Sequence, residues 1–234
     1  MAINVTQLNF FEDGTSYIEG KNALKFCIKK HDAKTAKLHY DIRLQFKNSV
    51  LISFAVKPGL SMDPEMFAEG VLVPDHFMNA FRREGTILIG KGEGAVLHFD
   101  EGLYSIPGVR NLKELIKALE IGLKRGSFIV IFDGYKMKGE FIFSLRTDAK
   151  GTKWTIRKTN DGYATNAEDI IQEGSILTNK KLDYYIELYK KQRSILAALN
   201  PTEYDKFIKD NIGDSFMYKN HKLSPRPNKI FPFD

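Results

Sequence analysis

At 234 residues, with 43% hydrophobic and 27% charged residues, the chain has the composition of a globular protein, which excludes wholesale disorder. It has no apolar run of the roughly 20 residues that a membrane-spanning helix requires, and its single cysteine, Cys27, excludes an internal disulfide and a cysteine-rich zinc site. We therefore expect a cytoplasmic protein with no secretory signal and no membrane partner, whose net charge of +6 modestly favours an anionic partner such as nucleic acid.

Short alternating apolar segments, separated by turn residues, dominate the chain from Leu24 to Trp154. Such segments are typical of antiparallel strands, because side chains along a strand point alternately to its two faces. The strands that we expect are Lys25–Lys29, Leu38–Phe46, Val50–Val56, Thr86–Ile89, Ala95–Phe99, Phe128–Phe132, Glu140–Leu145 and Lys153–Lys158. Their number and spacing predict a mainly β protein that forms a small antiparallel barrel or a sandwich.

One helix is expected within this region. Asn111 and Gly126 stand where an N-cap and a C-terminal cap belong, on either side of an amphipathic stretch. We expect this helix to flank the sheet.

The character of the sequence changes after the strands, which divides it into a β-barrel domain at residues 1–165 and an α-helical extension at residues 166–234. Lys180–Leu199 predicts a long helix, and Asn200-Pro201 predicts the start of a second helix that would end at Gly213. We expect their apolar side to dock on the barrel or, as a second possibility, to form a dimer. We do not expect the site chemistry to depend on them.

The segment Leu38–Leu44 carries the most informative functional pattern. On a strand, His39, Asp41 and Arg43 would share one face, and His31 lies close enough in sequence to fold back over them. Imidazole and carboxylate are ligands for a divalent ion, whereas a guanidinium group binds phosphate oxygens. The pattern alone leaves two interpretations open: a site for a metal and a phosphate, or a half-exposed strand with polar residues on its solvent side.

The two blocks that contain these residues, Phe26-Cys27-Ile28-Lys29-Lys30-His31-Asp32-Ala33 and Leu38-His39-Tyr40-Asp41-Ile42-Arg43-Leu44, resemble the 3′-phosphoesterase domain of bacterial DNA ligase D and its stand-alone relatives. Shorter similarities follow in the same order along the chain, at Ala55-Val56, Asp63-Pro64, Asp75-His76, Glu84-Gly85, Asp133 to Gly139, Trp154 to Lys158 and Asp161-Gly162. The resemblance covers about Leu24 to Ala164.

This resemblance implies a small β-barrel with a manganese-type divalent ion held by His31, His39 and Asp41. It also implies that Arg43 and His76 contact the scissile phosphate, with His76 placed to donate a proton to the leaving oxygen. The implied reaction belongs to DNA repair: it removes a 3′-terminal ribonucleoside from nucleic acid and then the remaining 3′-phosphate. A separate ligase or polymerase would be the partner that uses the product.

Several residues depart from the family pattern around this site. Two extra residues separate His31 from His39, and Lys29 replaces a glutamine. The loop at Gly90–Gly94 is short and lacks tyrosine, and Ala80 stands in place of a tyrosine. The metal ligands are intact, so we expect metal binding, whereas the altered phosphate surroundings predict a weakened second, phosphatase step.

Two other functions fit parts of the pattern. His39, Asp41 and His98 could form the facial triad of a non-haem iron oxygenase, although this leaves His31 and the later similarities unexplained. The other alternative is a barrel that binds nucleic acid without turnover, which the loss of the tyrosine at Ala80 favours.

Overall fold

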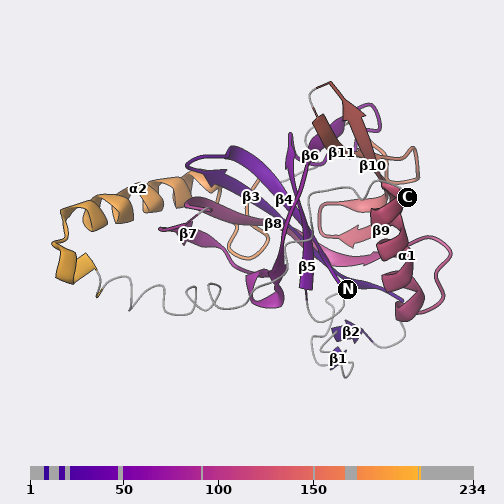
Figure 1. Cartoon of the computed structure of the whole chain (residues 1–234), viewed down its shortest axis with the longest axis horizontal. Helices are drawn as coiled ribbons and strands as arrows, with labels where there is room; N and C mark the ends of the chain where they lie inside the picture. The colour runs from indigo at the N-terminus through magenta and orange to yellow at the C-terminus, as the bar shows by residue number, and fades with distance from the viewer. Residues whose placement is uncertain are drawn as a thin grey trace.

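Eight strands close into an antiparallel barrel in the order β3-β4-β5-β6-β11-β10-β9-β8, because β8 also pairs with β3 (Figure 1). The computed structural model describes residues 8–10, 16–18, 22–46, 50–90, 92–149, 151–166, 173–204 and 206. The barrel strands are β3 (Leu24–Ala33), β4 (Lys37–Gln45), β5 (Val50–Lys57), β6 (Phe67–Phe77), β8 (Gly94–Ser105), β9 (Ser127–Gly134), β10 (Lys138–Asp148) and β11 (Gly151–Lys158). The mainly β barrel is therefore confirmed over the sandwich.

Three short strands lie outside the closed barrel. Strand β7 (Gly85–Ile87) pairs with the first residues of β8, so the loop around Gly92 connects the two strands of a hairpin. Strands β1 (Leu8–Phe10) and β2 (Ser16–Ile18) pair only with each other. The site described below lies where β8 runs between β3 and β7.

Each of the eight predicted strands overlaps an observed strand, but β6 was not predicted. Its sequence contains Gly70 and Pro74, which interrupt the apolar alternation that identifies a strand. The structure shows how Pro74 is accommodated: the pairing register of β5 and β6 shifts there, which is a β-bulge. A bulge leaves part of the hydrogen-bond ladder unmade, so a residue without an N–H is tolerated in it.

The bulge in β6 also decides which side chain faces the site. Val73 pairs with Ser53, but the next recorded pair joins His76 to Leu51, so β6 carries one residue more than β5 between the two pairs. Without this extra residue, Asp75 would face the same side as Ser53. The bulge therefore brings His76 onto that face instead.

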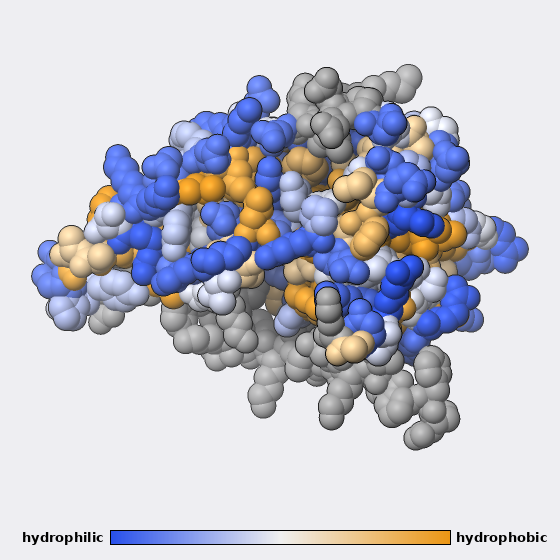
Figure 2. Space-filling view, turned by 90° about the horizontal axis from the view of Figure 1, so that it is seen from above, coloured by the Kyte–Doolittle hydropathy of each residue, from blue (hydrophilic) through white to orange (hydrophobic). Residues whose placement is uncertain are grey.

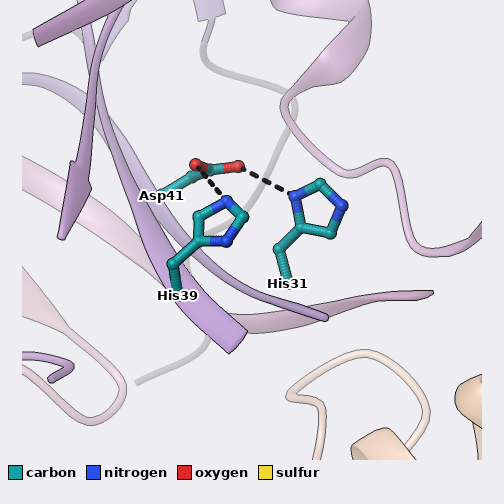
Figure 3. Close-up of side chains that lie close together, drawn as sticks. All are labelled: His31, His39 and Asp41. Atoms are coloured by element: carbon teal, nitrogen blue, oxygen red, sulfur yellow. Dashed lines mark ion pairs between the residues drawn. The ribbon is translucent and has the colours of Figure 1, made fainter. Parts of the chain in front are cut away.

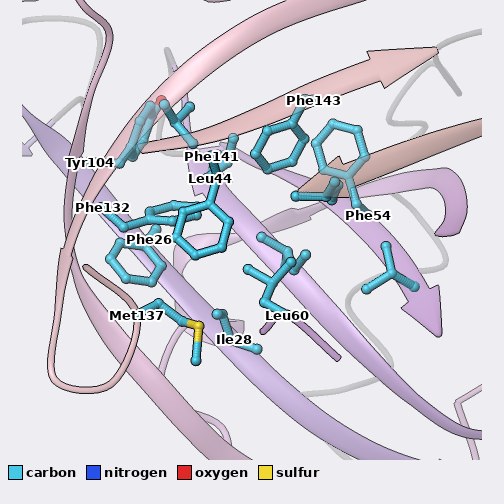
Figure 4. Close-up of a cluster of buried hydrophobic side chains, with 14 of the residues drawn as sticks. Phe26, Ile28, Leu44, Phe54, Leu60, Tyr104, Phe132, Met137, Phe141 and Phe143 are labelled. Atoms are coloured by element: carbon cyan, nitrogen blue, oxygen red, sulfur yellow. The ribbon is translucent and has the colours of Figure 1, made fainter. Parts of the chain in front are cut away.

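Aromatic side chains fill the interior of the barrel (Figure 4). Phe128 stacks on Phe143 with ring centroids 4.7 Å apart, and Phe54 meets Trp154 edge-on at 5.4 Å. Truncating one such ring to alanine costs about 3–5 kcal/mol, because the cavity closes only in part. The interior is thus a packed core, and chemistry must take place on the other face of the barrel wall or at its ends.

Helix α1 (Leu112–Arg125) covers one end of this core. The Asn111 side chain accepts a hydrogen bond from the Glu114 N–H, and Gly126 ends the helix in the left-handed conformation with φ of 77°, both as predicted. Its apolar face, with Leu115 and Leu119 fully buried, belongs to the same core as the strands.

Helix α2 (Leu182–Ala198) docks on β7 and β8, at the far end of the molecule from α1 in Figure 1. Leu182 and Tyr185 join the barrel core, which confirms the predicted docking on the barrel. The predicted start of the next helix at Asn200 is confirmed by a capping box, in which the Asn200 and Glu203 side chains each accept a hydrogen bond from the other residue's backbone N–H. The predicted end of this second helix, at Gly213, lies outside the described residues, and no described helix is long and apolar enough to span a membrane.

On the face shown in Figure 2, the described residues are mostly hydrophilic, and the apolar ones form separate small patches. The large apolar side chains that are exposed are likewise scattered over several elements, as Phe67 on β6, Ile121 on α1 and Tyr184 on α2 illustrate. Single exposed apolar residues are normal on monomeric proteins. The expectation of a dimer through the C-terminal helices stays a prediction.

Candidate metal centre

The β3–β4 hairpin brings the three predicted ligands to one face of the barrel wall. His31 pairs directly with His39, and Asp41 follows on the same face of β4, opposite Lys29. Strand β3 continues past its predicted end at Lys29 as far as Ala33, and this extension places His31 opposite His39. The polar residues of both strands therefore line up as a single row.

This face of β3 and β4 is buried. The alternative interpretation, a half-exposed strand with its polar residues in solvent, would have left these side chains exposed. His31, His39, Asp41 and Arg43 each retain only 5–8% of their surface. The segment after β6 contributes to the cover, because Phe81 packs on residues of the same face. On the opposite face of β4, Ile42 and Leu44 are in the core, whereas Leu38 is 44% exposed because it lies beside the hairpin turn.

The donor atoms of His31, His39 and Asp41 converge on one point. His31 Nδ1 lies 3.8 Å from Asp41 Oδ2, and His39 Nε2 lies 3.4 Å from Asp41 Oδ1 (Figure 3). Two donors that share an ion at about 2.1 Å are roughly 3.0–3.5 Å apart. One donor from each residue lies within 4.8 Å of the other two, so small side-chain rotations would close the three around a cation. No second group of this kind occurs in the described part of the chain.

Two backbone carbonyls set the tautomers of the two histidines. His31 Nε2 is 2.9 Å from the Gly92 oxygen, and His39 Nδ1 is 2.7 Å from the Lys37 oxygen. A carbonyl only accepts hydrogen bonds, so the bonded nitrogen carries the proton and the other nitrogen of the neutral ring keeps its lone pair. The nitrogens left with lone pairs are the two that face Asp41. A carbonyl on the far nitrogen is the usual support of a metal-binding histidine.

The electrostatics of the group favour a positive charge between the three side chains. Burial raises the pKa of Asp41, but its contacts with the His31 and His39 rings and the charge of Arg43 hold it well below the ordinary value. Burial lowers the pKa of His39, but its hydrogen bonds with Asp41 and with the Lys37 carbonyl raise it overall. The ionised carboxylate thus attracts a cation, which a proton or a divalent ion can supply.

Arg43 continues the row beside the metal ligands. One of its terminal nitrogens donates to Asp41 Oδ2 at 3.0 Å, and the other donates to the Ala80 carbonyl at 3.2 Å. Its Nε–H is buried and has no hydrogen-bond partner within the described part of the chain. A buried, charged donor without a partner is costly, and a phosphate oxygen would satisfy it.

Residue 80, where the resemblance predicted a tyrosine, lies at the site but contributes only its backbone carbonyl. Ala80 ends a short 3-10 helix, η3 (Met78–Ala80), and its carbonyl contacts Arg43. The neighbouring Phe81 does not substitute for the expected tyrosine, because its ring packs with Cys27 and Leu51. No hydroxyl group is therefore supplied from this position.

His76 reaches the same face through Ser53, which pairs with Arg43 across the sheet. His76 Nδ1 lies 2.9 Å from Ser53 Oγ, whose own hydroxyl can donate to the Leu51 carbonyl at 3.2 Å. Burial and then the charge of Arg43 lower the pKa of His76 to about 4. At neutral pH the His76 ring is therefore uncharged, which argues against the expected role of His76 as the proton donor to the leaving oxygen.

His98 belongs to a different cluster, which argues against the oxygenase alternative. Its Nδ1 contacts the buried Lys29 ammonium, and its Nε2 lies 2.8 Å from Glu101 Oε2. Both ring nitrogens are thus occupied, and the group that could hold an ion contains His31 instead. The sequence pattern could not separate the two because it gives no partners for His98.

Sequence reasoning missed the residues that orient the ligands. Gly92 and Lys37 act through their carbonyls and Ser53 through its hydroxyl, and neither kind of contact leaves a motif. One signal was available for Lys37: it stands in a short hairpin turn, where a residue with positive φ is common, and its φ is 59°.

Comparison with known families gives one match. A family model described as the DNA Ligase D 3′-phosphoesterase domain matches residues 29–145, which is half of the chain. The matched residues include His31, His39, Asp41, Arg43 and His76. A comparison with curated proteins found no match.

Proposed function

Because the chain belongs to the DNA ligase D 3′-phosphoesterase family, we propose that it is a metal-dependent phosphoesterase that processes the 3′ ends of nucleic acids in DNA repair. The observation that carries the proposal is the convergence of His31 Nδ1, His39 Nε2 and an Asp41 oxygen, with both histidine tautomers already set by carbonyls. We propose Mn²⁺ as the ion, because imidazole and carboxylate together suit a borderline divalent metal.

Three protein ligands leave coordination positions for a phosphate oxygen and a water, and a bound divalent ion would withdraw charge from that oxygen and acidify that water. Arg43 lies next to this point and would bind a second phosphate oxygen through its Nε–H, which has no other partner in the described structure. Its bond to Asp41 holds the guanidinium in place for this contact.

His76 would enter the reaction as a neutral imidazole. When Ser53 donates to the Leu51 carbonyl, Ser53 Oγ accepts from His76 Nδ1–H, and His76 Nε2 is left as an acceptor. His76 could then take a proton at Nε2, and it could return a proton to the leaving oxygen only after it has taken one.

Hydrolysis of a terminal ribonucleoside would form a bond between the water oxygen and phosphorus and break the bond to the 5′-oxygen of that ribonucleoside. The product strand would end in a 3′-phosphate. Because Ala80 brings no hydroxyl group to the site, we propose that the following removal of this phosphate is slow. The same feature favours the second candidate, a barrel that binds nucleic acid ends without turnover.

A primer–template duplex with one 3′-terminal ribonucleotide tests both candidates. With Mn²⁺ we expect a product one nucleoside shorter that keeps its 3′-phosphate, and no product with His39→Ala. Binding of the duplex without any shortening would support the second candidate. Rapid and complete conversion to a 3′-hydroxyl would contradict the proposed consequence of Ala80.

A further inference from the structure

Helix α2 is tied to the loop that supports the metal ligand His31. The contact runs through Glu93, which follows Gly92 in the β7–β8 loop. Tyr189 donates its hydroxyl to Glu93 Oε1 at 2.7 Å, and Arg193 Nε lies 3.0 Å from the same oxygen. Both residues stand on one side of α2, one turn apart.

The loop in turn contacts both the hairpin and the ligand. The Lys34 N–H donates to the Glu93 carbonyl at 2.8 Å, and the Gly92 carbonyl bonds His31 Nε2 at 2.9 Å. Glu93 therefore fixes the peptide that is adjacent to the carbonyl on His31. Its side chain is only 15% exposed, so solvent screens the contact with Arg193 less than it would screen a surface pair.

Within the loop itself, the Glu93 N–H donates a hydrogen bond to the Gly90 carbonyl at 3.1 Å. Gly90 and Gly94 lie on either side of Gly92 with φ of 100° and 153°, in a region that side chains other than glycine rarely adopt. The contacts of the Glu93 side chain with Tyr189 and Arg193 add to these backbone bonds in holding the peptide that carries the Gly92 oxygen.

We propose that Tyr189 and Arg193 of α2, acting through Glu93, are positioning residues that keep the Gly92 carbonyl on His31 Nε2. They thereby hold His31 in the tautomer that presents Nδ1 to the ion. This inference rests on the proposed metal site, and it departs from the expectation that the C-terminal helices do not affect the site. The helix is thus a part of the metal centre's support as well as a cover for the barrel edge.

The contacts that dock α2 can be separated from the contacts that position the loop. Docking rests on buried apolar residues such as Leu182 and Leu196, and on a bond of 2.6 Å between Gln192 and the Thr86 hydroxyl of β7. None of these touches Glu93. Gln192 is therefore a matched control, since it lies on the same helix beside Arg193 and also makes a polar contact with the barrel.

The first test is calorimetric titration of Mn²⁺ into the full chain. We expect Tyr189→Phe with Arg193→Met to weaken binding about tenfold, the lower end of the effect of removing a residue that orients a metal ligand. Gln192→Leu should change the affinity less than twofold. Equal weakening by both variants, or none by the double variant while the wild type binds, would overturn the proposal.

The second test is made without metal, by ¹⁵N NMR of the histidine rings, which distinguishes the two neutral tautomers. We expect His31 in the wild type to carry its proton on Nε2, and in the double variant to populate both tautomers. His39 should not change, because its carbonyl comes from Lys37 in the hairpin. An unchanged His31 in the double variant would overturn the proposal, whereas a changed His31 in a protein that binds no Mn²⁺ would refute the metal site alone.

Discussion

Two clusters of charged residues share one buried face of the barrel wall, and they differ in what their atoms have as partners. The metal-centre cluster is defined as His31, His39, Asp41 and Arg43. It brings one ligand atom each of His31, His39 and Asp41 within 4.8 Å of one another, and its Arg43 Nε–H is buried without a partner in the described structure. The neighbouring closed cluster consists of four residues that satisfy one another: Lys29, His98, Glu101 and Arg82.

In the closed cluster each charged group is matched by a group in the structure. Lys29 contacts His98 Nδ1 and donates to the Arg83 carbonyl at 2.9 Å, and Arg82 holds the Glu101 carboxylate with two of its nitrogens. Burial raises the pKa of Glu101, but its bonds with His98 and Arg82 lower it to about 2. Both clusters combine histidine with charged side chains that, apart from Arg82, are buried, so charge and burial do not by themselves identify a site. A binding site is identified by polar atoms that lie close together and have no other partner in the structure.

The largest effect is expected when a metal ligand is removed. Asp41→Ala and His39→Ala should each lower Mn²⁺ affinity at least 100-fold, because the site has three protein ligands and each variant removes one of them. Thermal unfolding of the metal-free His39→Ala variant should change little, whereas Asp41→Ala should be less stable because it leaves the buried Arg43 guanidinium without its carboxylate. Calorimetric titration and circular dichroism measure the two quantities, and wild-type affinity in either variant would place the site elsewhere.

The opposite pattern is expected for the closed cluster. Glu101→Ala leaves His98 Nε2 and the Arg82 guanidinium without their acceptor, which should lower the free energy of unfolding by about 3 kcal/mol. Mn²⁺ affinity should stay within threefold of the wild type. Urea denaturation provides the first number, and a large loss of Mn²⁺ binding in a folded Glu101→Ala protein would show that the clusters are not independent.

A pH series sharpens this contrast. The folded-state pKa of Glu101 is about 2, below the 4.5 of an unperturbed glutamate, so its contribution to stability is complete above pH 4.5 and is lost as the pH falls toward 2. The difference in unfolding free energy between the wild type and Glu101→Gln should therefore shrink over that range. We expect a change on the order of 2 kcal/mol, because the 60% exposure of the Arg82 side chain screens part of the interaction. A difference that does not depend on pH would mean that Glu101 is not stabilised as a carboxylate.

The smallest effect concerns the hairpin turn that supports His39. Lys37 has φ of 59°, which costs a residue with a side chain free energy that glycine does not lose. Lys37→Gly should raise the free energy of unfolding by less than about 1 kcal/mol and leave Mn²⁺ affinity unchanged, because the carbonyl on His39 remains. Weaker metal binding in this variant would show that the lysine side chain matters in its own right.

Much of this architecture was predictable from sequence because it depends on local patterns. The caps of α1 at Asn111 and Gly126 and the shared face of His39, Asp41 and Arg43 follow from turn chemistry and periodicity. The pairing of His31 with His39 does not, because the first strand was expected to end before His31. Strand β6 was missed because a bulge absorbs Pro74, and the bulge is visible only in the pairing with β5.

The contacts that orient the metal ligands could not be predicted from the sequence, for a different reason. The Gly92 carbonyl reaches His31, and Tyr189 reaches Glu93, across 61 and 96 positions of the chain. A backbone oxygen is present at every residue, so nothing in the sequence marks the one that orients a ligand. Only the closed barrel, with α2 docked on its edge, brings these groups together.

The most direct test of the metal centre is anomalous diffraction from crystals of the full chain soaked in Mn²⁺. The arrangement predicts one peak about 2.0–2.2 Å from His31 Nδ1, His39 Nε2 and an Asp41 oxygen, with the Gly92 and Lys37 carbonyls still bonded to the other ring nitrogens. A peak at the His98–Glu101 pair, coordination through His31 Nε2, or no peak at millimolar Mn²⁺ would contradict it.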